Sequence, residues 1–422
     1  MDIKDLKKDI ILKKKHKYFD FTASALALRS VEKEIRKILL TYANTHSDSA
    51  LNSFITQKYY DDSRAYIKKS LALSDDFALI ACGTGASAAI KKFQELLGLY
   101  VPPLVKKKYF SNIDKKDLPL VIIGPFEHHS NEISFREALC ECIRVPLNKN
   151  LEVDYEFFEK TLQENSQRKI IISFSLASNV TGVFSDYKKI YSLAKKYKAI
   201  LAFDGASFIA YKNINCDFYD ALFISSHKIL GGVGACGLLA IKKSLCGDIP
   251  SFAAGGTVSY VSKSSANYLN DVEILEEGGT PGILQLIRAS LAFKKRDEIG
   301  LDYIEKKSKI LKEYFLKKLE QIEDVVLYAG NFKDRLCIFS FNINGISPFD
   351  LSYTLSKYYK IETRAGCACA GPYGHDLLGL KDNQKLENKP GWLRVSLHYT
   401  HDIEDLDYFF DSLKKSIDRL KY

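Results

Sequence analysis

The sequence lacks several features that would place a protein in a membrane or in a repetitive class. It has no apolar run near the roughly 18 residues that a membrane span needs. Its lysine-rich beginning, Met1 to Lys17, lacks the long apolar centre of a signal peptide. It also has no internal repeat, no linker rich in proline or serine and no low-complexity block. We therefore expect a globular cytoplasmic protein that does not enter a membrane.

The nine cysteines lack the close spacing of a small disulfide-bonded domain, so we expect reduced thiols in a reducing compartment. The formal net charge of +9 comes from lysines spread along the chain, for example in Lys13–Lys15, Lys91–Lys92 and Lys106–Lys108. Such scattered runs are typical of solvated faces, and no nucleic-acid recognition element accompanies them. A basic protein does attract anionic cofactors and substrates.

The central part of the chain has the pattern of an α/β domain. Short apolar runs with few polar interruptions alternate there with helical patterns, as expected for strands buried on both faces. The predicted strands are Ala78–Cys82, Leu118–Ile123, Ile170–Phe174, Ile200–Phe203, Ala221–Ile224 and Gly237–Ile241, and the predicted helices are Ala86–Leu97, Tyr155–Gln163 and Tyr187–Tyr197. This alternation predicts a largely parallel sheet covered by helices.

The C-terminal part has a different pattern. A long amphipathic stretch from Leu284 to about Leu319 leads into it. Cys337–Ile343 and Leu393–Leu397 are typical of strands, and Phe349–Tyr358 and Ile403–Ile417 are typical of helices. We expect a smaller α+β domain here.

The segment Ser225-Ser226-His227-Lys228 carries the most specific chemical signal. It follows the predicted strand Ala221–Ile224 and precedes a flexible Gly-Gly-Val-Gly segment. A lysine that leaves a buried strand can have its pKa lowered by desolvation and by neighbouring cations, which makes it a competent imine-forming amine. Lys228 is therefore the first catalytic candidate, and a surface lysine in a turn is the alternative.

Two further strand ends could hold a flat, phosphate-bearing cofactor. Asp204 ends a predicted strand and is followed by the small residues Gly205 and Ala206, so its carboxylate could pair with a protonated pyridine nitrogen. A helix N-cap or turn aspartate is the alternative. The turn around Thr84 and Gly85 could bind phosphate through backbone N–H groups, or could use glycine for steric reasons alone. It has neither a Walker ending nor a full dinucleotide fingerprint.

Adjacent histidines, His128 and His129, follow the predicted strand that ends at Ile123. A neutral imidazole at such a strand end can stack on a ring and pass protons. Zinc is not expected, because adjacent histidines point in different directions and no His/Cys set at metal spacing accompanies them.

A loop rich in glycine and alanine carries Cys367 and Cys369. A mobile loop of small residues can carry a thiolate into a cleft and out again. A zinc site would need a second pair of cysteines, and the formal candidate, Cys140-x-Cys142, has the apolar setting of a core. We therefore predict no metal.

Arg394 lies within the otherwise half-apolar predicted strand around Leu393–Leu397. A buried guanidinium requires an anion, and its fork matches a substrate carboxylate. A structural ion pair with an internal Asp or Glu is the alternative.

Taken together and in this order, these segments resemble the class V group of fold-type I pyridoxal 5'-phosphate (PLP) enzymes, especially the cysteine desulfurase and selenocysteine lyase family. The resemblance runs from about Tyr18, where Tyr-Phe-Asp-Phe-Thr-Ala-Ser is similar to the family's opening, to the C-terminal helix. It implies the PLP-transferase fold of type I. The large PLP-binding domain, 26–289, would hold a mostly parallel seven-stranded sheet, and residues 1–25 and 290–422 would form the small domain.

The resemblance also implies a role for each matching residue. Lys228 would form the Schiff base, Asp204 would face the pyridine nitrogen and His128 would stack on the ring. Cys369 matches the nucleophilic cysteine, and Arg394 matches the anchor of the substrate carboxylate. The other matching positions are Thr84, Gly85, Ser225 and His227 for the phosphate, Asn179 for the cofactor hydroxyl and the substrate carboxylate, Ser207 for the cofactor and His46 for the substrate.

In family members the phosphate also receives a hydroxyl from a second subunit. Gly255-Gly256-Thr257 is similar to that element. The resemblance therefore implies a homodimer in which Thr257 serves the partner's site.

The implied activity is release of sulfur from L-cysteine, which leaves alanine and a cysteine persulfide and requires a sulfur-acceptor protein. Three positions depart from the family: Ser207 replaces a frequent glutamine, Ser47 an arginine near the substrate end, and Cys367 a histidine. They keep open a class V aminotransferase, epimerase or C–S lyase that acts on another amino acid. A further alternative is a binding protein that has the fold of these PLP enzymes but catalyses no reaction.

Overall fold

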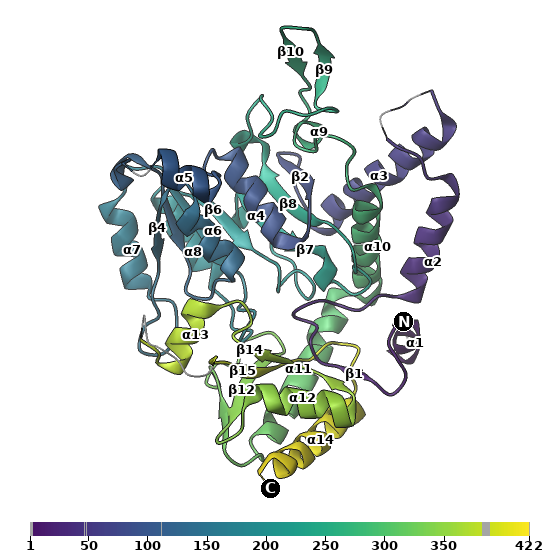
Figure 1. The fold of residues 1–422 in the computed structure, drawn as a ribbon, viewed down its shortest axis with the longest axis vertical. Coiled ribbons are helices and arrows are strands. Elements are labelled where there is room, and N and C mark those ends of the chain that lie inside the picture. The colour runs from purple at the N-terminus through teal and green to yellow at the C-terminus, as the bar shows by residue number, and fades with distance from the viewer. Residues whose placement is uncertain (1–2, 46, 48, 111, 382–388, 422) are drawn as a thin grey trace.

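The computed structural model describes residues 3–45, 47, 49–110, 112–381 and 389–421, and a seven-stranded sheet forms its centre (Figure 1). The strand order is β2 (Phe77–Cys82), β8 (Gly237–Lys242), β7 (Ala221–Ser225), β6 (Ile200–Asp204), β5 (Ile170–Ser175), β3 (Leu120–Ile123) and β4 (Glu141–Arg144). Strand β8 is antiparallel to both of its neighbours, and the other pairs are parallel. The prediction of a largely parallel sheet is confirmed.

Helices bury both faces of this sheet, which is why its strands are almost continuously apolar. Helices α4 (Gly85–Leu96) and α6 (His129–Glu137) cover one face through side chains such as Phe93 and Phe135. Helices α3 (Leu51–Ser70), α7 (Tyr155–Glu164), α8 (Tyr187–Lys196) and α10 (Ile283–Ile299) cover the other face. Shorter helices α1 (Ile3–Asp9), α2 (Arg29–Ile38), α5 (Pro103–Tyr109) and α9 (Val272–Leu275) lie around this domain and the N-terminal segment.

A second, antiparallel sheet forms the centre of the smaller domain. Its order is β11 (Val325–Leu327), β12 (Ile338–Ile343), β15 (Trp392–Ser396) and β14 (Arg364–Gly366). Helices α11 (Leu301–Leu319), α12 (Pro348–Tyr359) and α14 (Ile403–Lys421) enclose a separate core around Phe315, Phe339 and Phe409. The predicted α+β part is confirmed, but the stretch expected from Leu284 onward is two helices, because Gly300 adopts φ 87° between them.

The N-terminal segment connects the two domains. Its strand β1 (Lys17–Tyr18) pairs in parallel with β13 (Ile361–Glu362), and Phe19 lies in the core of the small domain. Two residues later Phe21 belongs to the core of the large domain. The predicted division at residues 25/26 and 289/290 stays a prediction, and α10 runs across the second border.

A hairpin and a short helix complete the two domains. A hairpin of β9 (Val258–Val261) and β10 (Ala266–Tyr268) projects from the large domain at the top of Figure 1. Helix α13 (Gly371–Leu378) follows the cysteine-bearing loop of the small domain. None of the helices described is both long and apolar enough to cross a membrane.

The start of α4 rests directly on strand β8, and Gly237 makes this possible. A Cβ atom at position 237 would lie 2.0 Å from the carbonyl oxygen of Gly85. We expect Gly237→Ala to lower the free energy of unfolding by about 1–3 kcal/mol, because backbone must move to admit the methyl group. The measurement is the urea midpoint at unchanged slope.

Gly247→Ala is the matched control, because its Cβ would meet only atoms at 3.8 Å. Its midpoint should stay within about 0.5 kcal/mol of the parent protein. Equal midpoints for the two variants would contradict the close contact between α4 and β8.

Candidate active site

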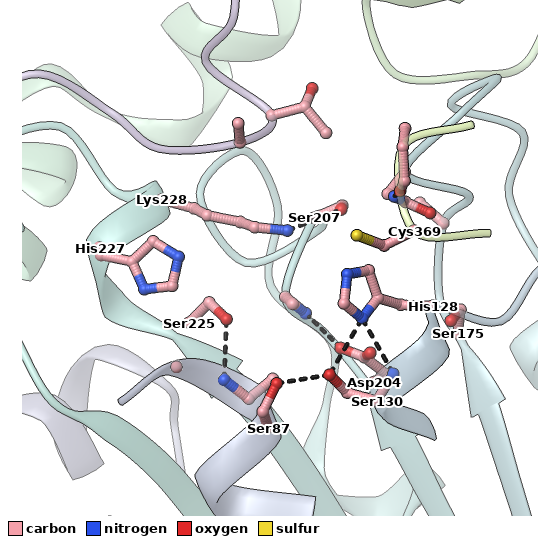
Figure 2. Close-up of a pocket in the computed structure, with 18 of the residues that line it drawn as sticks. Ser87, His128, Ser130, Ser175, Asp204, Ser207, Ser225, His227, Lys228 and Cys369 are labelled. Carbon is pink, nitrogen blue, oxygen red and sulfur yellow. Dashed lines mark hydrogen bonds between the residues drawn. The ribbon is translucent and has the colours of Figure 1, made fainter. Parts of the chain in front are cut away.

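A cavity of about 410 Å³ lies where the two domains meet (Figure 2). The ends of β5, β6 and β7, the start of α4 and the loop after β14 supply its walls. The carboxyl ends of parallel strands are where open α/β sheets bind ligands. The predicted site residues that line the cavity are Thr84, Gly85, His128, Asn179, Asp204, Ser207, Ser225, His227, Lys228, Cys369 and Arg394.

Lys228 stands in a short 3₁₀ helix, η4 (Ser226–Lys228), directly after β7, and its side chain crosses the cavity (Figure 2). Burial lowers the pKa of Lys228 to about 8, although the carboxylate of Asp204 opposes this shift. Its Nζ donates a hydrogen bond to Ser207 Oγ at 3.4 Å. The alternative of a surface lysine does not hold, and a sizeable fraction of the amine is neutral near pH 8.

Asp204 is the last residue of β6 and is buried. Its Oδ1 accepts a hydrogen bond from the Ala206 N–H at 2.8 Å. Asp204 therefore also stabilises the turn that follows the strand, which was the alternative prediction from the sequence. Among the residues described, none donates to Oδ2. Burial raises the pKa of Asp204, and this carboxylate is therefore a group that a cationic N–H in the cavity would stabilise.

The start of α4 has the features of an anion site. Thr84 occupies the N-cap position, but its side chain makes no capping hydrogen bond. It therefore leaves the first backbone N–H groups of the helix available to other acceptors. The hydroxyl of Ser225 accepts from the Ala86 N–H at 2.8 Å. A Cβ at Gly85 would lie 2.8 Å from the His227 ring and 3.2 Å from Ser225 Oγ. These groups therefore converge on one small space at a helix N-terminus.

His128 caps the N-terminus of α6 with its ring. Its Nδ1 accepts the Ser130 N–H at 3.1 Å, so the neutral ring carries its proton on Nε2. Burial, together with the charge of Lys228, lowers the pKa of His128 to about 4. The imidazole is therefore neutral at physiological pH and presents an uncharged face.

Cys369 reaches the cavity from the small domain, in the loop between β14 and α13. Figure 2 shows its sulfur pointing toward the ends of Lys228 and Ser207. Its carbonyl oxygen accepts the His129 N–H at 2.8 Å, and Asn179 Nδ2 donates to the carbonyl oxygen of Ala368 at 2.7 Å. The thiol of Cys369 and the amine of Lys228 therefore face one space.

Arg394 pairs with an internal carboxylate, which is the structural ion pair that the sequence offered as the alternative to substrate binding. Its Nη2 lies 2.8 Å from Asp20 Oδ1, and Arg364 lies 2.8 Å from Asp20 Oδ2. Both arginines also line the cavity, and Arg394 Nε has no hydrogen-bond partner among the residues described. One aspartate thus faces two guanidinium groups, and the excess positive charge suits a substrate carboxylate.

Of the predicted site residues that the structure describes, Thr257 is not among those that line this cavity. Thr257 is buried and its hydroxyl donates to the carbonyl oxygen of Ala254 at 2.7 Å, so its role toward a second subunit stays a prediction. His46 lies outside the described residues. No group of three or more His, Cys, Asp or Glu suited to a metal ion occurs in the part of the chain that the structure describes.

The sequence profile of the family described as "Aminotransferase class-V" matches residues 17–409. The chain belongs to this family. Members of the family are PLP-dependent enzymes, and the resemblance stated from the sequence is confirmed.

Individual relatives agree with this family. A protein of Pyrococcus abyssi named "Probable cysteine desulfurase" is 27% identical over 432 residues, which cover 99% of this chain and 98% of that protein. A protein of Borreliella burgdorferi with the same name is 30% identical over 326 residues, which cover 74% of this chain and 72% of that protein. The apo structure of a cysteine desulfurase from Thermococcus onnurineus superposes with a TM-score of 0.83 at 23% identity, over 100% of this chain and 99% of that chain, which confirms the expected fold.

Sequence reasoning missed Asp20 and Arg364 in this class-V enzyme. Asp20 lies between Phe19 and Phe21, and a carboxylate in an apolar segment needs a cationic partner. This pattern could have indicated a buried ion pair. Sequence reasoning also missed Ser130, whose N–H orients the ring of His128.

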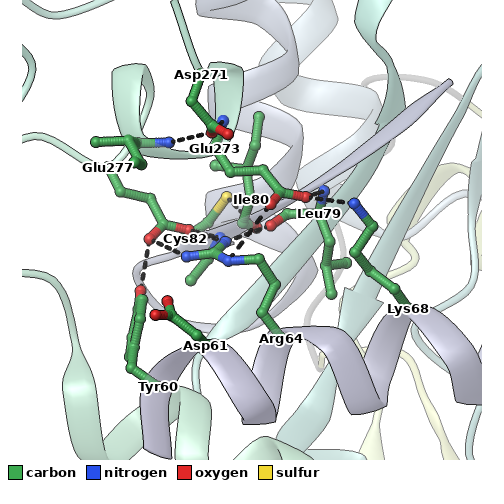
Figure 3. A network of polar contacts seen from close by, with 12 residues as sticks. Tyr60, Asp61, Arg64, Lys68, Leu79, Ile80, Cys82, Asp271, Glu273 and Glu277 are labelled. Carbon is green, nitrogen blue, oxygen red and sulfur yellow. Dashed lines mark hydrogen bonds and ion pairs between the residues drawn. The ribbon is translucent and has the colours of Figure 1, made fainter. Parts of the chain in front are cut away.

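A second buried charge cluster, none of whose charged residues lines this cavity, lies at the free edge of the large sheet (Figure 3). Glu277 accepts the Ala81 N–H at 2.6 Å and Arg64 Nη1 at 2.7 Å, and Glu273 accepts the Leu79 N–H at 2.7 Å. Arg64 in turn donates to the carbonyl oxygen of Leu79 at 2.6 Å. Side chains thus satisfy the outward backbone groups of edge strand β2, which protects the edge from pairing.

This cluster should contribute stability in the class-V enzyme. We expect Glu277→Ala to cost about 3–5 kcal/mol, because it leaves the buried Arg64 without its bidentate partner. Urea unfolding measures the loss, and hydrogen exchange at the amides of Leu79 and Ala81 locates it.

Glu34→Ala removes an exposed pair with Lys37 and serves as the control. It should cost about 1 kcal/mol or less. A Glu277→Ala protein as stable as this control would contradict the assignment of the cluster to the edge of the sheet.

Proposed function

We propose that this class-V enzyme is a PLP-dependent cysteine desulfurase, which releases sulfur from L-cysteine and leaves alanine and a persulfide on Cys369. The observation that carries the proposal is the meeting of Lys228 and the Cys369 thiol in one cavity between the domains. The relatives that share most of its length and are named probable cysteine desulfurases support the same activity.

The residues of the cavity fit PLP. The N-terminus of α4, with Thr84, Gly85, Ser225 and His227, offers N–H and side-chain groups for a phosphate. Asp204, buried and with one oxygen not hydrogen-bonded by any described residue, would pair with the pyridine N–H. The neutral ring of His128 would stack on the cofactor, and Asn179 and Ser207 would lie beside it. PLP, when bound, supplies an electron sink for the carbanion at the substrate Cα.

Lys228 moves the proton in this proposal. With a pKa of about 8, far more of its Nζ is unprotonated near pH 8 than an ordinary lysine would allow, and an unprotonated amine can remove the substrate Cα proton. The same residue would hold that proton within the cavity and return it to Cα when alanine forms. With PLP bound, Asp204 would favour the protonated form of the pyridine nitrogen.

Arg394 and Arg364 bind the substrate carboxylate. They share Asp20 and keep one positive charge in excess, and this charge would attract that carboxylate. The amino acid is thereby oriented with its side chain toward the loop of the small domain.

Cys369 takes the sulfur. Its thiolate attacks the substrate sulfur, so that a sulfur–sulfur bond forms while the substrate carbon–sulfur bond breaks. The electron pair of the broken bond remains on the substrate carbon, which takes up a proton and becomes the methyl group of alanine. The sulfur stays on the exposed Cys369 for transfer to a sulfur-acceptor protein.

We also propose that the enzyme is a cytoplasmic homodimer. Apolar side chains are exposed on the turn η1 (Leu39–Thr41) and on α3, with Leu40 83% and Phe54 58% exposed, and a second copy of the chain would cover them. Nine unpaired thiols are compatible with a reducing compartment.

The proposed activity predicts a separation between two variants. Lys228→Ala should lack the absorbance band that the parent protein shows between roughly 320 and 450 nm with PLP. Cys369→Ser should keep the band and lose the equimolar formation of alanine and sulfide from L-cysteine. Spectra and product assays on the same samples measure both.

Cys367→Ala is the matched control, because it removes a thiol from the same loop. It should keep the band and the turnover. Sulfide production that persists in Cys369→Ser would instead indicate a C–S lyase, and spectral changes with another amino acid together with keto-acid formation would indicate an aminotransferase.

A further inference from the structure

The loop that carries Cys369 belongs to the small domain but is held by the large domain. Its strand β14 ends at Gly366, and α13 begins at Gly371. Between them, three hydrogen bonds cross to the large domain: His129 N–H to the Cys369 oxygen at 2.8 Å, Gly371 N–H to His129 Nε2 at 2.7 Å, and Asn179 Nδ2 to the Ala368 oxygen at 2.7 Å. His129 makes two of the three.

The backbone of the loop needs such support. Ala368 and Cys369 adopt φ values of 52° and 57°, the left-handed region that non-glycine residues rarely occupy. Two such residues in succession persist only where the surrounding contacts hold them. The direction of the Cys369 thiol into the cavity therefore depends on the contacts that fix residues 368–371.

The imidazole of His129 provides a contact that only a neutral ring can make. Its Nε2 accepts a hydrogen bond, so the proton of the ring lies on Nδ1. Burial, assisted by the charge of Arg136, lowers the pKa of His129 and favours this neutral form. A Cβ on Gly371 would lie only 3.0 Å from Nε2, so the close approach uses the absence of a side chain there.

His129 is not among the residues that line the cavity, whereas its neighbour His128 is. It therefore acts on the chemistry only through the loop. We propose that His129 is a positioning residue that latches the Cys369 loop against the large domain through its Nε2, and that opening this latch frees the loop to move its sulfur outward.

This inference rests on the proposed function, because a sulfur carrier must face the substrate first and an acceptor afterwards. A single hydrogen bond from a backbone N–H to a neutral ring is weak enough to break and remake during turnover. The latch joins α6 of the large domain to α13 of the small domain, so a small movement of one against the other opens it.

Three substitutions in the full-length PLP-loaded protein test the latch. His129→Gln can place its side-chain oxygen near the position of Nε2 and keep an acceptor for the Gly371 N–H. His129→Asn has a shorter side chain, with its acceptor nearer the position of Nδ1. His129→Phe keeps a ring of similar size and has no acceptor. The absorbance band of bound PLP and the urea midpoint show that each variant is folded.

The first readout is the rate at which iodoacetamide alkylates Cys369, followed by the mass of its peptide. We expect the rate to rise about five-fold or more in His129→Phe and His129→Asn, the factor that corresponds to loss of one hydrogen bond, and to return close to the parent value in His129→Gln. The second readout is desulfurase kinetics, where kcat should fall in the same two variants while KM for L-cysteine stays unchanged, because Arg394 is untouched.

Equal alkylation rates in folded His129→Phe, His129→Gln and parent protein would overturn the latch, whatever the enzyme's activity. Alkylation that follows the expected order in a protein that does not convert cysteine to alanine would leave the latch in place and remove the proposed function instead. A KM that rises with kcat unchanged would assign His129 to substrate binding and contradict its role in positioning the loop.

Discussion

The shared ion pair of Asp20 with Arg364 and Arg394 is the interaction on which the site depends. Asp20 comes from the N-terminal segment, Arg364 from β14 and Arg394 from β15, and Arg394 also donates to the carbonyl oxygen of Asn179 at 3.0 Å. One carboxylate thus ties the N-terminal segment and the small sheet together, while Arg394 reaches the loop of the large domain that carries Asn179. Since a buried guanidinium without an anion is costly, these contacts favour the arrangement of the two domains that encloses the cavity.

Within the cavity, burial sets the charge of each group. It lowers the pKa of Lys228 to about 8 and that of His128 and His227 to about 4, and it raises the pKa of Asp204. The result is a neutral histidine, a lysine that can lose its proton and a carboxylate suited to a cationic partner. These are the protonation states that the proposed chemistry requires, and they follow from the position of each residue at a strand end or a helix start.

The sequence predicted the large sheet well because its strands are buried on both faces and therefore read as apolar runs. The six predicted strands agree with the observed ones within two residues at either end, whereas the edge strand β4 was missed, since Glu141 and Arg144 are only half-buried. Strand ends located Lys228, Asp204 and Ser225 for the same reason. Asp20 could not be assigned, because its arginine partners lie 344 and 374 residues away along the chain. No role could be assigned to His129 from the sequence. Its contact with Gly371 depends on where the cysteine-bearing loop packs against the large domain, 242 residues further along the chain.

The central claim is that Cys369 receives the sulfur within a cavity built for a lysine-bound cofactor. Mass spectrometry of the Cys369 peptide after a single turnover of L-cysteine, without reductant, tests it most directly. The account predicts a peptide heavier by one sulfur atom in the parent protein, and no such gain in a Lys228→Ala protein treated in the same way. An unmodified Cys369 peptide alongside equimolar alanine would contradict it.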